Sequence, residues 1–250
     1  MSNLKGVGVA LVTPFNEDLS VDFDSLTRLV EYNIENGTNY LVVLGTTAEA
    51  ATLSAAEKQE VIKHVIKINN KRLPLVLGIG GNNTLEVKKQ IEEADLTDFD
   101  AVLSVSPYYN KPNQEGLYQH YKMLASTGKQ IIIYNVPGRT GQNIEASTTL
   151  RLANEFPNLF MIKEACPNIN QYFDILRTKP EGFSLVSGDD EYALPVTLAG
   201  GDGVISVIGQ GYPKEFSTML QLAFEGKVKE AYEIHNKLVE IIRLIFAEGN

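Results

Sequence analysis

The stretch Phe160-Met161-Ile162-Lys163-Glu164-Ala165 is a short apolar run with a lysine near its end, and its place in the chain decides the fold class. Apolar, β-branched runs of this length between longer amphipathic segments are typical of buried strands. A buried strand has little use for an ammonium group, because removing that charge from water is costly. Lys163 therefore lies at an edge, is paired, or is kept neutral as a nucleophile that can form a Schiff base.

Seven further apolar runs alternate with amphipathic segments around this stretch. The eight predicted strands cover residues 7–11, 40–44, 75–78, 101–106, 130–134, 160–165, 183–187 and 203–207. The helices predicted to follow them cover residues 22–36, a segment beginning at Ser54, 84–94, 114–126, 146–155, 170–177, 192–199 and 214–224. The strands are apolar on both faces, which is typical of a parallel sheet covered by helices.

Eight such units in a chain of 250 residues predict an α/β protein of the (β/α)8 or TIM barrel class. The alternative is a doubly wound open sheet, which more often has a phosphate-binding glycine loop where this chain has Thr13-Pro14-Phe15. We expect one barrel over residues 1–225 and the start of a C-terminal helical region over 226–250. The last helix, 227–247, is apolar over more than one stripe and is expected to be buried.

The composition excludes several function classes. A net charge of −9 argues against nucleic-acid and anionic-membrane partners. A single cysteine, Cys166, excludes a disulfide framework and fits a reducing cytoplasm. No apolar run approaches the roughly 20 residues that span a bilayer. Asp189-Asp190 lacks the companion ligands of a metal site, so we expect neither a metal nor a cofactor.

Active sites of such barrels lie at the C-terminal ends of the strands, and polar residues gather there in this sequence. Threonine hydroxyls can hold a carboxylate, tyrosines can transfer protons, and an arginine fork can bind a second carboxylate. With one lysine among them, these groups predict imine chemistry on a 2-oxo acid. The residues are Thr46, Thr47, Tyr109, Tyr134, Arg139 and Lys163.

Each of these elements also has a plain structural interpretation, which the residues alone leave open. The alternatives are a helix-entry turn at Gly45-Thr46-Thr47, aromatic packing on a partner subunit by Tyr108-Tyr109, a surface pair of Arg139 with Glu145, and a helix N-terminus at Asp189-Asp190.

Four segments of the chain together resemble the dihydrodipicolinate synthase family of pyruvate-dependent class I aldolases, whose superfamily includes N-acetylneuraminate lyase. The resemblance runs from about Val7 to the end of the chain, and the set of motifs is specific although no single one would be. The segments are Gly45-Thr46-Thr47-Ala48-Glu49, Tyr134-Asn135-Val136-Pro137-Gly138-Arg139-Thr140, Ile162-Lys163-Glu164-Ala165 and Gly203-Val204-Ile205-Ser206-Val207.

The resemblance implies a pyruvate pocket. Lys163 would form the Schiff base, Thr46 and Thr47 would hold the carboxylate of pyruvate, and Ile205 would line the pocket through its backbone. Gly188 would contribute to the same substrate pocket.

The resemblance also implies a second substrate, aspartate 4-semialdehyde, and the product 4-hydroxy-tetrahydrodipicolinate on the way to lysine and diaminopimelate. Tyr134 would transfer protons at the imine, linked through Thr46 to Tyr109, which in this family reaches in from a neighbouring subunit of a dimer or tetramer. Arg139 would bind the carboxylate of the aldehyde substrate. The alternatives are an aldolase acting on a sugar acid, such as a sialate lyase, and a truncated inactive barrel.

The sequence departs from the family pattern near the Thr46-Thr47 turn and at the C-terminus. Ala48 and Ala50 stand where the family usually has glycine and serine. If position 48 needs a positive φ, alanine would cost about 1 kcal/mol there. The family normally continues past Asn250 with further helices, so its C-terminal helical segment is expected to be cut short here.

A lysine-binding regulatory site is a further family feature. It would use Asn82, Glu86 and Tyr108, all of which are present. The lysine-sensitive enzymes often have serine and histidines at three positions where this chain has other residues, which argues against lysine regulation. These positions are Ala50, Ala55 and Lys58.

Overall fold

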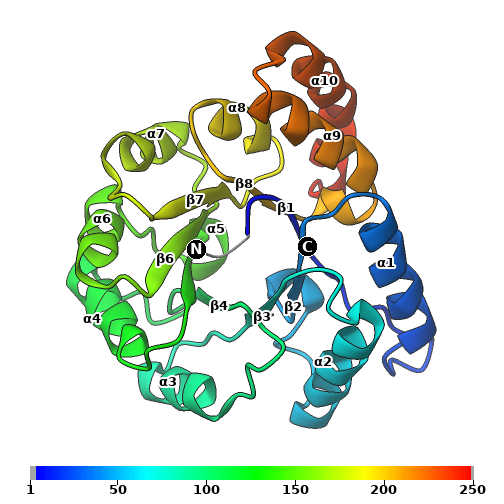
Figure 1. Cartoon of the computed structure of the whole chain (residues 1–250). Coiled ribbons are helices and arrows are strands. Elements are labelled where there is room, and N and C mark those ends of the chain that lie inside the picture. The colour runs from blue at the N-terminus through cyan, green and yellow to red at the C-terminus, as the bar shows by residue number, and fades with distance from the viewer. Residues whose placement is uncertain (1–3, 249–250) are drawn as a thin grey trace.

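The computed structural model describes residues 4–248 of the chain. Eight parallel strands form a closed barrel in sequence order, and β8 returns to pair with β1 (Figure 1). The closed barrel confirms the predicted fold class and excludes the open doubly wound sheet. The strands are β1 (Gly6–Ala10), β2 (Tyr40–Val43), β3 (Leu75–Gly78), β4 (Ala101–Val105), β5 (Ile131–Asn135), β6 (Leu159–Glu164), β7 (Ser184–Ser187) and β8 (Gly203–Ser206).

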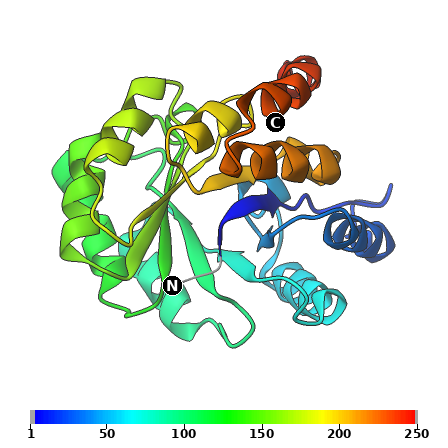
Figure 2. The same ribbon diagram turned by 45° about the horizontal axis from the view of Figure 1, so that its top comes forward.

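A ring of helices surrounds the strands (Figures 1 and 2). The helices predicted from sequence are present with bounds shifted by one or two residues. They are α1 (Phe23–Glu35), α2 (Ala55–Asn69), α3 (Thr84–Glu93), α4 (Gln114–Ala125), α6 (Ala146–Glu155), α7 (Ile169–Thr178), α8 (Ala193–Leu198), α9 (Pro213–Phe224) and α10 (Val228–Ile245).

Three short helical turns were not predicted. They are the helix α5 (Pro137–Thr140) and the 3-10 turns η1 (Thr46–Ala48) and η2 (Ile208–Gln210). Each lies in a loop that follows a strand, and each is too short to show an apolar period. Pro137 occupies the first turn of α5, where its fixed φ and missing N–H are tolerated.

The strands place alternate side chains on opposite faces of the barrel wall. Ile132, Met161, Val186 and Ile205 belong to the cluster that fills the barrel interior. The intervening residues, Ile133, Ile162 and Leu185 among them, pack outward against the helices. Lys163 is two residues beyond Met161 and so points inward, whereas Glu164 points outward toward the helices.

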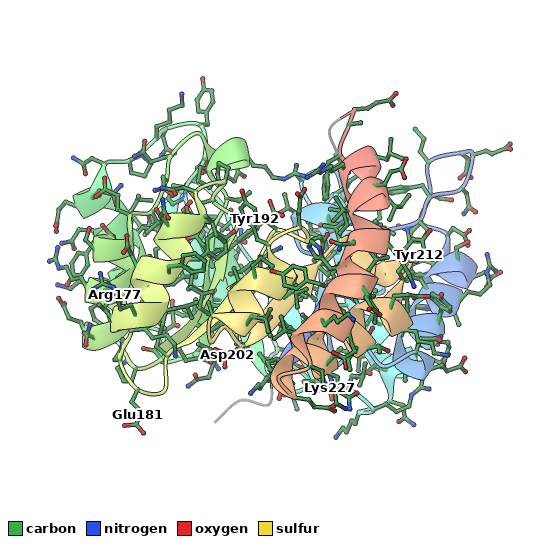
Figure 3. The ribbon with its side chains drawn as sticks, turned by 90° about the horizontal axis from the view of Figure 1, so that it is seen from above. Arg177, Glu181, Tyr192, Asp202, Tyr212 and Lys227 are labelled. Atoms are coloured by element: carbon green, nitrogen blue, oxygen red, sulfur yellow. The ribbon has the colours of Figure 1, made fainter. Side chains whose placement is uncertain are left out.

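The helix α10 lies alongside α9, with Lys227 at its start (Figure 3). Ala231, His235, Leu238 and Ile242 are buried, so the expected burial is confirmed for one stripe of the helix. The expected burial is wrong for the C-terminal end of the helix, because large apolar side chains there are exposed to solvent. They are Leu244, Ile245 and Phe246, with exposed fractions of 61%, 44% and 40%.

Candidate active site

Lys163 lies near the C-terminal end of β6, buried in the mouth of the barrel. Its side chain is 3% exposed, and its Nζ lies 4.3 Å from the centre of the Tyr134 ring. The two residues are direct partners across β5 and β6, so the strand register itself brings them together. None of the ion pairs within residues 4–248 includes Lys163. A buried amine without a carboxylate partner is suited to nucleophilic attack on a carbonyl once its proton has left.

Gly188, directly after β7, leaves the room that the Lys163 side chain occupies. A Cβ at this position would lie 3.0 Å from both Cγ and Cε of Lys163 and 2.8 Å from the Cβ of Ala165. The Gly188 N–H donates to the Glu164 carbonyl at 2.6 Å, which ties the end of β7 to the lysine strand. The structure therefore places Gly188 beside Lys163.

Ile205 lies on β8 in the same interior layer and is fully buried. The turn after it is held by Asp190, whose carboxylate accepts from the backbone N–H groups of Val207 and Ile208 at 3.1 and 3.0 Å and also from Ser206 Oγ. Burial raises the pKa of the Asp190 carboxyl above its ordinary value. Sequence reasoning missed this role, because the acceptor and its donors are 16 to 18 residues apart.

Asp189 has the helix role that the sequence left open for this pair. Its Oδ1 accepts from the N–H groups of Glu191 and Tyr192 at 2.9 and 3.4 Å, immediately before α8. The two adjacent aspartates therefore have different partners. Asp189 bonds to the turn that enters α8, and Asp190 bonds to the turn after β8.

The Thr46-Thr47 turn is the short helix η1 after β2. Thr47 is buried with an exposed fraction of 8%, whereas Thr46 is exposed. The left-handed residues are Leu44, with φ 56°, and Glu49, with φ 53°; Ala48 is not among them. The strain considered for Ala48 is therefore absent. Its carbonyl accepts from Thr13 Oγ1 at 2.7 Å, which anchors the turn to the loop after β1.

The remaining predicted residues lie on exposed loops at the same end of the barrel. Tyr109 is 88% exposed with a left-handed φ of 72°, and Arg139 is exposed on α5. Arg139 and Glu145 form no ion pair within residues 4–248. In the same range no hydrogen bond joins the hydroxyls of Tyr134, Thr46 and Tyr109. This single chain therefore does not connect the three hydroxyls that the resemblance links.

The three residues of the expected regulatory site lie on two neighbouring loops. Asn82 and Glu86 belong to the loop and first turn at α3, and Tyr108, 40% exposed, follows β4. The loops are joined by Asn110 Nδ2, which donates to the Asn82 carbonyl at 3.1 Å. The structure thus brings these residues to one edge of the barrel mouth.

Glu164 is a fully buried carboxylate that sequence reasoning did not single out. It accepts hydrogen bonds from Asn135 Nδ2, Gln171 Nε2 and the Cys166 N–H, each at 2.8 Å. Burial raises the pKa of this carboxyl to about 7, while the three donors act in the opposite direction. A signal was present in the sequence, since an acidic residue follows the lysine in a strand whose other residues are apolar.

Within residues 4–248 no three His, Cys, Asp or Glu side chains come close enough together to hold a metal ion. None of the helices in that range is long and apolar enough to span a membrane.

Comparisons with known proteins identify the family and the fold. The model of the Dihydrodipicolinate synthetase family matches residues 3–250. Over 246 residues the chain is 57% identical to the 4-hydroxy-tetrahydrodipicolinate synthase of Flavobacterium psychrophilum, covering 98% of this chain and 84% of that protein. The fold matches that of dihydrodipicolinate synthase from Acinetobacter baumannii complexed with pyruvate, with a TM-score of 0.95, 42% identity and coverage of 99% and 85% of the two chains.

A dihydrodipicolinate synthase variant described as monomeric matches equally well, with a TM-score of 0.95, 39% identity and coverage of 98% and 83% of the two chains. The matches extend over nearly the whole chain and include every strand of the barrel. The chain belongs to the dihydrodipicolinate synthetase family.

Proposed function

We propose that this enzyme condenses pyruvate with aspartate 4-semialdehyde to give 4-hydroxy-tetrahydrodipicolinate, in the biosynthesis of lysine and diaminopimelate. The observation that carries the proposal is the buried amine of Lys163, 3% exposed and 4.3 Å from the centre of the Tyr134 ring. Relatives that bear the name of this synthase at 57% and 52% identity support it.

In this proposal Lys163 Nζ attacks the keto carbon of pyruvate, and loss of water leaves an imine. Loss of a proton from the methyl group then gives an enamine, which attacks the aldehyde carbon and restores the imine. The amino group of the aldehyde substrate then attacks the imine carbon, which closes the ring and releases Lys163 Nζ. Tyr134, whose ring faces the amine, would move the protons of these steps. Thr46 and Thr47 would hold the pyruvate carboxylate in the barrel mouth. Ile205 would line the pocket through its backbone, and Gly188 would shape it.

The exposed residues would serve the second substrate. Arg139, whose planar fork suits a carboxylate, would bind that of aspartate 4-semialdehyde. Thr46 and Tyr109 would complete a proton path from Tyr134 to solvent. Residues 1–225 would form the catalytic barrel, and residues 226–250 would begin the C-terminal helical region.

Borohydride trapping tests the proposal. Pyruvate and borohydride should add one reduced adduct to Lys163, seen by intact mass and peptide mapping, and Lys163→Ala should abolish it. An adduct elsewhere, or none, would overturn the assignment. An adduct without turnover of aspartate 4-semialdehyde would favour an inert barrel, and turnover of a sugar acid instead would favour a different pyruvate aldolase.

The enzyme would act as a homo-oligomer in the cytoplasm. Tyr109, 88% exposed in a left-handed conformation, supports a partner subunit that receives this side chain. Mixing inactive Lys163→Ala and Tyr109→Phe chains should restore activity if each subunit supplies one residue to the other. A monomer in light scattering that keeps full turnover would argue against this arrangement.

We also propose that lysine does not regulate this enzyme. The support is the presence of Ala50, Ala55 and Lys58 at positions where sensitive enzymes often differ. Calorimetry should detect no binding of lysine at millimolar concentration, and inhibition by lysine together with its loss in Glu86→Ala would contradict this.

A further inference from the structure

A cluster of buried and half-buried polar side chains lies outside the barrel wall, behind the strand ends that carry Lys163 and Tyr134. We call it the amide cluster; it comprises Gln114, Asn135, Asn143, Glu164 and Gln171. The layer around it is otherwise apolar, with Ile133, Ile162 and Tyr172 fully buried. Burying amides and a carboxylate in such a layer is costly unless every group is bonded, so the cluster calls for an explanation.

The Glu164 carboxylate is the centre of the cluster. Its Oε1 accepts from Asn135 Nδ2 and from the Cys166 N–H, and its Oε2 accepts from Gln171 Nε2, each at 2.8 Å. Both oxygens of Glu164 act as acceptors here, so both amides turn their NH₂ groups toward it. The carboxylate therefore sets the direction of every bond further out.

The oriented amides leave their oxygens for a third residue and its neighbour. Asn143 Nδ2 donates to Gln171 Oε1 at 2.8 Å, and Asn143 Oδ1 accepts from Asn135 Nδ2 at 2.8 Å. The Ile144 N–H donates to Asn135 Oδ1 at 2.9 Å. These bonds fix the loop between α5 and α6 against the end of β5 and against α7, and Glu164 at the end of β6 bonds in turn to Asn135 and Gln171.

Gln114, on α4, holds the same loop from the other side. Its Nε2 donates to the Asn143 carbonyl at 2.8 Å, and its Oε1 accepts from the Glu145 N–H at 3.1 Å. Residues 143–145 are thus hydrogen-bonded directly to the strand β5 and to the helices α4 and α7.

The held loop is continuous with the turn that carries Arg139. The helix α5 ends at Thr140, whose Oγ1 donates to the Gln142 carbonyl at 2.8 Å. The segment between Arg139 and Asn143 is therefore short and hydrogen-bonded within itself. Glu164 and Asn135 directly follow Lys163 and Tyr134 on their strands. The cluster therefore links the exposed arginine to both inner residues through rigid backbone.

We propose that the amide cluster positions Arg139 relative to Lys163 and so determines how well the enzyme binds the carboxylate of its aldehyde substrate. Its members are positioning residues that touch neither substrate. The inference rests on the proposed function, because it assigns Arg139 to the second substrate.

The test begins with Asn143→Ala, which removes the hydrogen bonds of one partly exposed side chain and leaves the barrel core intact. The KM for aspartate 4-semialdehyde should rise about ten- to a hundredfold, as for a small misplacement of a binding group. The KM for pyruvate and the rate of borohydride trapping at Lys163 should stay as in the wild type. The matched control is Asn154→Ala, an exposed asparagine on α6 bonded only to the Leu150 carbonyl, which should change none of these.

A double-mutant cycle with Arg139→Ala separates positioning from general damage. If Asn143 acts through Arg139, the double variant should have the same KM for the aldehyde as Arg139→Ala alone. Additive effects, or an equal loss of trapping and aldehyde binding, would overturn the inference. Gln114→Ala, which releases the loop from the other side, should repeat the result if Asn143→Ala folds poorly. A wild-type chain that forms no pyruvate adduct would overturn the proposed function and this inference with it.

Discussion

The inner part of the candidate site and its rim differ in how completely one chain builds them. The inner part, comprising Tyr134, Lys163, Gly188 and Ile205, is fixed by strand register and close packing. The rim, comprising Thr46, Tyr109 and Arg139, is exposed on loops. Its hydroxyls make no hydrogen bonds with the inner part within residues 4–248.

The difference separates two tasks. In the proposed function, Schiff-base formation would need only groups that a single barrel already places, because neighbouring strands bring the Lys163 amine and the Tyr134 ring together. Recognition of the second substrate and proton exchange with solvent would need groups on the rim, which fewer contacts hold in place. The amide cluster holds the segment that carries Arg139, whereas no comparable set of hydrogen bonds among the described residues holds Tyr109.

The largest effect is expected from Tyr134→Phe, which tests whether the inner part performs chemistry. Loss of the hydroxyl should lower kcat about 10²- to 10⁴-fold, the range for a general acid or base. The free energy of unfolding should change by less than about 0.5 kcal/mol, because the hydroxyl has no hydrogen-bond partner within residues 4–248. Steady-state kinetics and urea unfolding measure both, and an unchanged kcat would remove Tyr134 from the mechanism.

Gly188→Ala tests how tightly the inner part is packed. The added Cβ would lie 3.0 Å from Lys163 Cε, so the lysine must move. We expect the rate of pyruvate adduct formation to fall about 100-fold. Trapping with borohydride at timed intervals measures this rate. Gly211→Ala is the control, since its Cβ would meet nothing closer than 3.7 Å. Equal rates in the two variants would show that the lysine has spare room.

The pH dependence of stability tests the ionisation of Glu164 behind the inner part. Its pKa of about 7 in the folded chain lies above the ordinary value of 4.5. Between these pH values the folded chain therefore keeps a proton on Glu164 that the unfolded chain has lost. The contribution of Glu164 to the free energy of unfolding should therefore fall by about 3 kcal/mol as the pH rises from 4.5 to 7, and stay constant above.

Urea unfolding of the wild type and of Glu164→Gln at pH 5, 6, 7 and 8 isolates this contribution. The neighbouring Tyr121, Tyr172 and Cys166 have pKa values raised by burial, so they stay neutral in this range. The free energy of unfolding of the wild type minus that of Glu164→Gln should decrease as the pH rises. A difference that grows or stays constant would mean that the carboxyl is ionised throughout.

The smallest effect is expected at the rim, from Ala48→Gly. Because Ala48 has no left-handed φ, glycine would relieve no strain there. It should instead lower the free energy of unfolding by up to about 1 kcal/mol through added freedom of the unfolded chain. Thermal unfolding measures the change, and a stabilised variant would show that the turn is strained after all.

By itself the sequence determined the barrel, the order of its strands and the residues of the inner part. Short apolar runs and amphipathic helices are local patterns, and eight repeats of them leave one closed architecture. Lys163 and Tyr134 could be paired from sequence because parallel strands place their C-terminal ends together. The short helix α5, which carries Arg139, escaped prediction because four residues show no period.

Only the tertiary structure decided how the loops are held. The Asp190 contacts and the side-chain bonds among the members of the amide cluster join residues 7 to 29 positions apart, and the sequence does not state which acceptor a donor will find. It also decided that Ala48 is unstrained, because backbone dihedrals in a turn depend on what the turn packs against. The period of apolar residues is a local property of the sequence, whereas the partners of a long-range hydrogen bond depend on which segments the fold brings together.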